Sequence, residues 1–145
     1  MMKVLQLGKF YPIKGGVEKV MEIFTEGLAE RGFPSDMLCV SRNGNTENVI
    51  LSEHARVLRT QKLAEIAATM ISPQLIWRLR CIRRKYDIIH VHHPDPMAAV
   101  ALFFSGYKGK VVLHWHSDIL KQKFLLRFFK PLQSWLIRRA DLILG

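Results

Sequence analysis

The sequence predicts an α/β fold, a Rossmann-like doubly wound parallel sheet. Short apolar segments alternate along the chain with longer segments of helical periodicity. Glycines or histidines follow three of the apolar segments, where a parallel sheet binds its ligands. With 145 residues, of which 49% are hydrophobic and 23% charged, the chain is one domain by length and can bury a sizeable core.

The first predicted unit is a strand, a glycine loop and a helix. In chain order it comprises a strand that begins at Val4 and breaks at Tyr11 and Pro12, the pair Gly15 and Gly16, a helix over 17–31, and Gly32 as its end. Adjacent glycines let a backbone approach a ligand without a Cβ in the way. The start of a helix favours a bound anion. The same pattern fits an ordinary strand–helix connection, and the glycines alone do not separate the two interpretations.

The remaining predicted elements continue the alternation. They are strands over 37–40, 49–51 and 57–58, helices over 61–71 and 74–85, a strand that runs into a loop over 87–94, a helix over 96–105, a strand over 110–114, a helix over 119–139 and a strand over 140–145. Ser72 and Pro73 should stop the helix over 61–71, and Pro131 should kink or divide the one over 119–139. Because the chain stops as a strand finishes, we expect residues 1–145 to be a truncated N-terminal domain.

Positive charge is concentrated in the second half of the chain. The formal net charge is +10; residues 1–73 hold nine Lys and Arg against eight Asp and Glu, whereas residues 74–145 hold thirteen against four. Such a surface favours a polyanionic partner, which can be anionic lipid, nucleic acid or a phosphorylated substrate. The two cysteines form no CxxC pair, which favours a reducing compartment, and no apolar run is long enough to span a bilayer.

Several motifs together resemble the N-terminal half of a family 4 retaining glycosyltransferase of the GT-B fold. In order they are Tyr11-Pro12, Gly15-Gly16-Val17-Glu18, Arg31-Gly32, Tyr86-Asp87-Ile88-Ile89-His90-Val91-His92, Val111-Val112-Leu113-His114-Trp115-His116-Ser117-Asp118 and Arg139-Ala140-Asp141-Leu142-Ile143. Their order and spacing, which cover essentially the whole chain, carry the resemblance. One departure is Phe33-Pro34-Ser35, after which the second strand is expected to start late.

The resemblance implies an enzyme that moves a sugar from a nucleotide-sugar, its co-substrate, to an acceptor with retention at the anomeric carbon. In the family this half mainly binds the acceptor, while a C-terminal domain with a Glu-x7-Glu motif binds most of the donor. That domain is absent from residues 1–145, so this chain alone is expected to be inactive. No cofactor and no nucleic acid are expected. A lipid-linked or glycan acceptor would place the protein in the cytoplasm, peripheral on the inner face of the cytoplasmic membrane.

The resemblance also assigns roles to residues. His116 is the candidate catalytic residue close to the transferred sugar, although histidine is also common at strand ends. Gly15 and Gly16 would approach the donor diphosphate. The candidate acceptor-binding residues are Tyr11, Glu18, His92, His93, Asp95 and Asp118. His93 and Asp95 are expected in a loop, and Ser117 or Asp118 is equally suited to cap a helix.

Four histidines at alternate positions raise the question of a metal. His90 and His92 share one face of a predicted strand, as do His114 and His116, and the pairs converge if the strands are neighbours. Because no carboxylate or thiolate stands at a standard ligand spacing, the prediction is that no metal binds.

Two predicted helices combine basic and bulky apolar residues, the composition of a helix that lies on an anionic membrane. The residues expected at such a surface are Trp77, Arg80, Arg83 and Arg84 from one helix and Lys123, Arg127, Lys130 and Arg138 from the other. Most of the neighbouring aromatic residues would instead lie in the core. One alternative function is a non-catalytic module that binds nucleic acid or anionic lipid. A dinucleotide-dependent oxidoreductase is less well supported, because this sequence lacks the GxGxxG motif.

Overall fold

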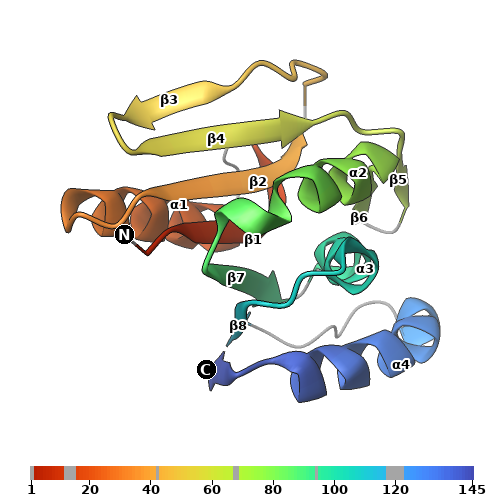
Figure 1. The fold of residues 1–145 in the computed structure, drawn as a ribbon. Helices are drawn as coiled ribbons and strands as arrows, with labels where there is room; N and C mark the ends of the chain where they lie inside the picture. Colours follow the sequence, from red (N-terminus) through yellow and green to blue (C-terminus); the bar gives the residue numbers. More distant parts are fainter. Residues whose placement is uncertain (1, 12–15, 42, 67–68, 94, 117–122) are drawn as a thin grey trace.

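The computed structural model describes residues 2–11, 16–41, 43–66, 69–93, 95–116 and 123–145. Seven described strands form one sheet in the order β3-β4-β2-β1-β7-β8-β9 (Figure 1). Their bounds are β1 Val4–Tyr11, β2 Ser35–Ser41, β3 Val49–Ser52, β4 Ala55–Thr60, β7 Ile88–His93, β8 Lys110–Trp115 and β9 Leu142–Leu144. All neighbours are parallel except β3, which pairs antiparallel with β4 at one edge. The predicted Rossmann-like sheet is confirmed, whereas β2 already begins at Ser35, before the predicted start at residue 37.

Helices cover both faces of the sheet, as a doubly wound fold requires. The helix α1 (Gly16–Glu30) returns the chain from β1 to β2 and lies on one face, which we call the α1 face. Helices α2 (Pro73–Ile82), α3 (Pro96–Ser105) and α4 (Lys123–Arg139) advance the chain in the opposite direction along the sheet and lie on the other face (Figure 1). The opposite directions of these right-handed crossovers require the opposite faces. No described helix is both long and apolar enough to cross a membrane.

The end of α1 follows from a glycine. Gly32 has a φ of 87°, and the amide of Phe33 donates to the carbonyl of Leu28 at 2.9 Å, which satisfies an acceptor at the end of the helix. The helix therefore stops where the sequence predicted.

Alternating side chains along the strands divide the interior into two. The larger core lies between the sheet and α2–α4 and includes Leu5, Leu7, Ile89, Val91 and Leu113. A smaller cluster lies under α1 and consists of Met21, Met37, Cys39 and Val57. Because successive residues of a strand point to opposite faces, Gln6, His90 and His92 lie on the α1 face of their strands. The middle of the sheet is thus apolar on one face and polar on the other.

The segment over 61–71, predicted to be helical, is a hairpin instead. It contains β5 (Ala64–Ile66) and β6 (Thr69–Ile71), which pair antiparallel. The hydroxyl of Ser72 donates to the carbonyl of Gln61 at 2.6 Å, so the ends of the segment meet. An eleven-residue helix would separate them by roughly 16 Å. Ser72 and Pro73 begin α2 as its N-cap and first residue.

Two further details differ from the helix predictions. Helix α4 is one helix from Lys123 to Arg139 with Pro131 inside it, so of the two predicted effects of this proline, a kink or a division, the division does not occur. The helix predicted over 74–85 is α2 followed by a short 3-10 turn, η1 (Arg83–Lys85).

The buried carboxylate of Asp36 joins segments that are far apart in the sequence. The hydroxyl of Tyr86 donates to its Oδ2 at 2.6 Å, and the guanidinium of Arg56 lies 3.3 Å from the same oxygen. Lys3 adds an ammonium group at 3.8 Å. Burial first, and then the Asp36 carboxylate, raise the pKa of Tyr86, so its hydroxyl keeps its proton and remains a donor. Asp36 therefore ties β2 to β4, to the start of β1 and to the chain before β7.

Candidate functional site

The candidate site lies at the carboxyl ends of β1, β7 and β8. These three strands are adjacent and parallel, so their ends meet at one edge of the sheet. The chain leaves β1 toward α1 and β7 toward α3 at this edge. His92 and His93 end β7, and His116 follows β8 directly. The predicted convergence of polar residues at this edge is confirmed for the histidines of β7 and β8.

Four imidazoles form a compact group that we call the histidine cluster, made up of His90, His92, His114 and His116. The Nε2 of His90 lies 3.2 Å from the Nδ1 of His114, and the Nδ1 of His92 lies 2.8 Å from the Nε2 of His116. Each distance is that of a hydrogen bond. The Nε2 of His92 also lies 2.6 Å from the Oε1 of Gln6 on β1. The cluster therefore consists of two hydrogen-bonded pairs, one of which extends to β1.

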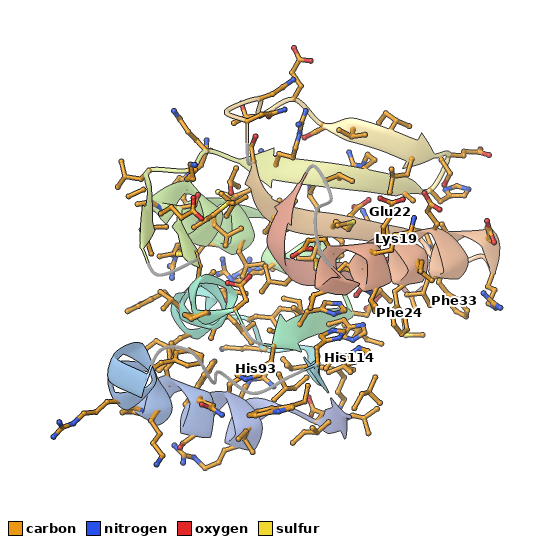
Figure 2. The ribbon with its side chains drawn as sticks, turned by 180° about the vertical axis from the view of Figure 1, so that it is seen from behind. Lys19, Glu22, Phe24, Phe33, His93 and His114 are labelled. Atoms are coloured by element: carbon orange, nitrogen blue, oxygen red, sulfur yellow. The ribbon has the colours of Figure 1, made fainter. Side chains whose placement is uncertain are left out.

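The two pairs stack on one another. Ring centroids are 4.3 Å apart between His90 and His92 and 4.0 Å apart between His114 and His116. Phe24 of α1 meets the rings of His90 and His114 edge-on, at centroid distances of 5.0 and 5.8 Å. Figure 2 shows Phe24 and His114 close together beneath α1. The helix on this face thus covers the cluster with an aromatic ring.

Burial decides the charge of the cluster. His90 is 5% exposed, and this burial, followed by the neighbouring His114 and His116, lowers its pKa to about 3. Burial also lowers the pKa of His114. Both rings are therefore neutral at pH 7, and each has one nitrogen that donates and one that accepts.

The cluster also has the composition of a metal site, so its geometry needs to be considered. Ligand nitrogens of His90, His92 and His114 all lie within 4.8 Å of one another. An imidazole binds a metal along a lone pair in its ring plane, but the rings of His90 and His92 are stacked at an angle of 27°. Lone pairs of stacked rings run side by side instead of converging on one point. The hydrogen bonds between His90 and His114 and between His92 and His116 therefore account for the short distances between ring nitrogens in the cluster.

Asp95 approaches β1 closely. Its Oδ1 accepts from the amides of Met97 and Ala98 at 3.1 and 3.3 Å and so caps α3. Its Oδ2 lies on the far side against Gly8, where a Cβ would come within 3.1 Å of this oxygen. Gly8 has a φ of 132° and falls where the register of β1 against β2 shifts. Asp95 can therefore cap α3 in this position because residue 8 is a glycine, whose missing Cβ leaves room for the carboxylate.

The structure places only some of the predicted site residues together. His92 and His116 are in direct contact, and Asp95 lies beside β1. Glu18 is buried in the first turn of α1, and Gly16 is the exposed first residue of that helix. Gly15, Asp118 and the side chains of Tyr11 and Lys123 lie outside the described residues.

His93 differs from the expectation. It is the last residue of β7 and not a loop residue, and it is 1% exposed. Its ring stacks on that of Trp115 at 3.9 Å and lies 6.2 Å from that of Phe129 on α4. Because it follows His92 directly, it points to the opposite face of the sheet, and Figure 2 shows it away from His114. His93 is therefore not part of the histidine cluster.

Sequence reasoning missed two residues of the site. Gln6 is fully buried between Leu5 and Leu7, and this polar interruption of an apolar segment was the available signal. Gly8 gave no signal of its own, because Asp95, the residue that approaches it, is far away in the sequence.

A second surface combines exposed aromatic and basic side chains on the α2–α4 face. Trp77 on α2 and Phe103 and Phe104 on α3 are 66%, 48% and 55% exposed. The ring of Phe103 meets that of Trp135 on α4 at 5.0 Å, and Arg80 donates to the carbonyl of Phe104 at 2.6 Å. Of the other basic residues predicted for a membrane surface, Arg83 is half-buried, and Arg84, Arg127, Lys130 and Arg138 are exposed. Helices α2, α3 and α4 contain no Asp or Glu.

A doubly wound α/β sheet with polar residues at its carboxyl edge is typical of Rossmann-like ligand-binding domains. The family description Glycosyltransferase Family 4 matches residues 14–145, and the chain belongs to this family.

Relatives of known type agree with this assignment. The chain is 34% identical over 146 aligned residues to O-antigen chain mannosyltransferase C of Escherichia coli and 28% identical over 146 residues to D-rhamnosyltransferase WbpZ of Pseudomonas aeruginosa. Each alignment covers 99% of this chain but only 39% and 38% of the relative. The chain thus spans about two fifths of the length of these relatives.

Solved structures share the fold at low sequence identity. Sucrose-phosphate synthase from Thermosynechococcus elongatus superimposes with a TM-score of 0.66 and 15% identity, covering 99% of this chain and 42% of the synthase. Anabaena Alr3699/HepE in complex with UDP superimposes with a TM-score of 0.59 and 17% identity, covering 98% of this chain and 37% of that protein. The same protein is also known in complex with UDP-glucose.

Proposed function

We propose that the chain is the acceptor-side half of a retaining glycosyltransferase that adds a sugar from a nucleotide-sugar to a glycan or lipid-linked acceptor in cell-surface polysaccharide synthesis. The observation that carries this proposal is the contact between His92 and His116 at the edge where β1, β7 and β8 end. The relatives transfer mannose and D-rhamnose, which makes these sugars the first candidates. Alr3699/HepE binds UDP and UDP-glucose, which supports a nucleotide-sugar as donor.

Within this proposal, the site residues act on the transferred sugar, on the donor diphosphate or on the acceptor. His116 hydrogen-bonds or electrostatically stabilises the sugar being transferred. Gly15 precedes Gly16, the first residue of α1, in the sequence, and the amides that start this helix suit the donor diphosphate. Tyr11, Glu18, Asp95 and Asp118 serve the acceptor side, whereas both ring nitrogens of the buried His92 are engaged by Gln6 and His116. The ring of His93 packs against that of Trp115 on the other face of the sheet. The nucleotide-sugar is consumed as a substrate, and the chemistry assigned to these residues calls on no cofactor.

The test of this proposal is transfer by the chain expressed together with whatever coding sequence follows it. We expect incorporation of labelled mannose, D-rhamnose or glucose from nucleotide-linked donors into a glycan or lipid-linked acceptor. His116→Ala should lower kcat by roughly 100-fold, because a charge-stabilising contact is lost. His54→Ala, which alters an exposed histidine at the turn before β4, is the matched control.

Two outcomes would contradict the proposal. One is the absence of transfer from every donor, and the other is full activity in the His116→Ala variant. Product analysis by NMR decides whether the anomeric configuration of the donor is retained.

We also propose that the aromatic and basic surface on α2–α4 docks on the anionic inner face of the cytoplasmic membrane. Charge complementarity supports this choice of partner, because three helices without a carboxylate surround the exposed rings of Trp77, Phe103 and Phe104. Aromatic side chains bind at the lipid interface, and each basic residue near an anionic surface contributes about 1 kcal/mol. A lipid-linked acceptor would be reached from this position.

Sedimentation with liposomes tests the docking surface. Removing two charges in the double variant Arg84→Gln and Lys130→Gln should weaken binding to vesicles with anionic lipid by roughly 30-fold. The double variant Lys19→Gln and Ile23→Gln, which alters exposed residues of α1 on the other face, should bind as the unchanged chain does. Equal loss in both variants, or equal binding to neutral and anionic vesicles, would refute the surface. Preference for nucleic acid at physiological salt would favour the nucleic-acid module instead.

A further inference from the structure

We propose that His92 is a positioning residue, which together with Gln6 fixes both the ring orientation of His116 and the nitrogen that carries its proton. The catalytic consequence rests on the proposed function, whereas the proton position is a property of this chain alone. Three side chains from three adjacent strands form this relay: Gln6 on β1, His92 on β7 and His116 after β8.

The geometry is that of directed hydrogen bonds and not of loose packing. Gln6 and His92 are both fully buried, so water does not compete for their polar atoms. The rings of His92 and His116 are inclined by only 19°, with their centroids 5.1 Å apart and the bonded nitrogens at 2.8 Å. Nearly coplanar rings at this separation meet edge to edge, in the direction of their lone pairs and N–H bonds.

The relay assigns each proton in turn. The Oε1 of Gln6 is a carbonyl oxygen and can only accept, so the Nε2 of His92 donates to it at 2.6 Å. When the His92 ring is in its neutral form, the acceptor is its Nδ1. The Nε2 of His116 must therefore hold the proton that it donates to His92. The bond made by one ring nitrogen thus fixes the tautomer of the next ring.

The neighbours of the relay limit how His116 can move. The ring of His114 stacks on that of His116 at 4.0 Å, and the ring of His90 stacks on that of His92 at 4.3 Å. The backbone amide of His116 donates to the carbonyl of His93 at 3.0 Å. Rotation of the His116 ring would break the bond to His92 and slide it off His114. Phe24 from α1 packs against the same rings.

The first test reads the tautomers directly by long-range ¹H–¹⁵N NMR of this chain. In the unchanged chain we expect His92 and His116 to be Nε2–H tautomers. His92→Phe keeps a ring in the stack and removes both hydrogen bonds, so His116 should exchange between tautomers. His90→Asn, in the neighbouring pair, should leave the tautomer of His116 unchanged. Gln6→Met, which removes the acceptor with little change in volume, gives a second variant if His92→Phe does not fold.

The second test measures the activity of the gene product that contains this chain. His92→Phe should lower kcat about 10- to 100-fold with little change in KM for the donor, the size of effect found when an orienting partner is removed. His92→Asn places an amide oxygen close to the former Nδ1 and should restore most of the loss.

The outcomes separate this proposal from the previous one. An unchanged His116 tautomer in the His92→Phe variant, or an Nδ1–H tautomer of His116 in the unchanged chain, would overturn the positioning role. If His116→Ala retains full activity while the tautomers change as expected, the positioning stands and the catalytic role of His116 fails. Equal kcat losses in the His92→Phe and His92→Asn variants would argue for a merely structural histidine and overturn the proposal.

Discussion

Gly8 shows how a missing side chain lets two segments meet beside the site. Its φ of 132° is rarely adopted by residues with a side chain, and a Cβ at this position would lie 3.1 Å from the Oδ2 of Asp95. The same carboxylate caps α3 through its other oxygen. Any larger residue at position 8 therefore disturbs both β1 and the start of α3.

We expect Gly8→Ala to lower the free energy of unfolding by about 1–3 kcal/mol, through backbone strain and the displaced Asp95. Urea unfolding followed by circular dichroism measures this difference. Gly27→Ala is the matched control, because position 27 lies inside α1 and its Cβ would meet only the flexible end of Arg31. That change should stabilise the chain by up to about 1 kcal/mol. Equal stability of the two variants would contradict the argument.

Single residues also show what sequence reasoning can reach. The pairing of His92 with His116 could be predicted from alternation along two strands, given that the strands are neighbours. The hydrogen bond to Gln6 could not, because it depends on β1 lying beside β7, a placement that no local pattern specifies. For the same reason His93 was misplaced, since its face follows only once β7 is known to extend to it.

At the level of elements, strands and helices with a clear period were predictable and the segment over 61–71 was not. Its Ala, Glu, Lys and Leu residues favour a helix locally. A hairpin forms instead because Ser72 both caps α2 and donates a hydrogen bond to the carbonyl of Gln61, which brings the two ends of the segment together. Pro131 was expected to kink or divide its helix, and local sequence left these two effects open; the structure shows that α4 is not divided.

The paired strands β7 and β8 make stability depend on pH. The pKa of His90 is about 3 in the folded chain, against 6.5 for an unperturbed histidine, so between these values the unfolded chain binds more protons. Stability is therefore complete above about pH 6.5 and falls as the pH falls toward 3. Lowering the pH from 7 to 5 should reduce the free energy of unfolding by at most about 2 kcal/mol from this residue.

Urea unfolding at pH 7 and pH 5 checks this prediction. His90→Asn should show a smaller loss between the two pH values than the unchanged chain, because the titrating ring is gone. His54→Asn, which replaces an exposed histidine, should keep the larger loss. The same loss in His90→Asn as in the unchanged chain would contradict the assignment.

At the scale of the whole molecule, the two proposed functional surfaces lie on opposite faces of the sheet. The histidine cluster lies on the α1 face at the carboxyl edge, whereas the aromatic and basic surface lies on the α2–α4 face. If the latter rests on lipid, the acceptor sugar has to extend past a layer of helices about 10 Å thick to reach His116. Under the proposed docking, this geometry favours an acceptor with several sugars between its lipid and its reacting end, and one relative is named as an O-antigen chain mannosyltransferase.

The position of β1 in the middle of the sheet has a consequence for synthesis of the chain. Val4 pairs with Ser35 on one side and with Ile88 on the other. Asp36 can meet Arg56 early, but its hydrogen bond with Tyr86 forms only after Tyr86 has been synthesised. A nascent chain on the ribosome therefore carries β1 with one open edge until β7 emerges. Such an edge can pair with a foreign strand. The interval between synthesis of β2 and of β7 is thus the period in which this chain is most exposed to misassembly.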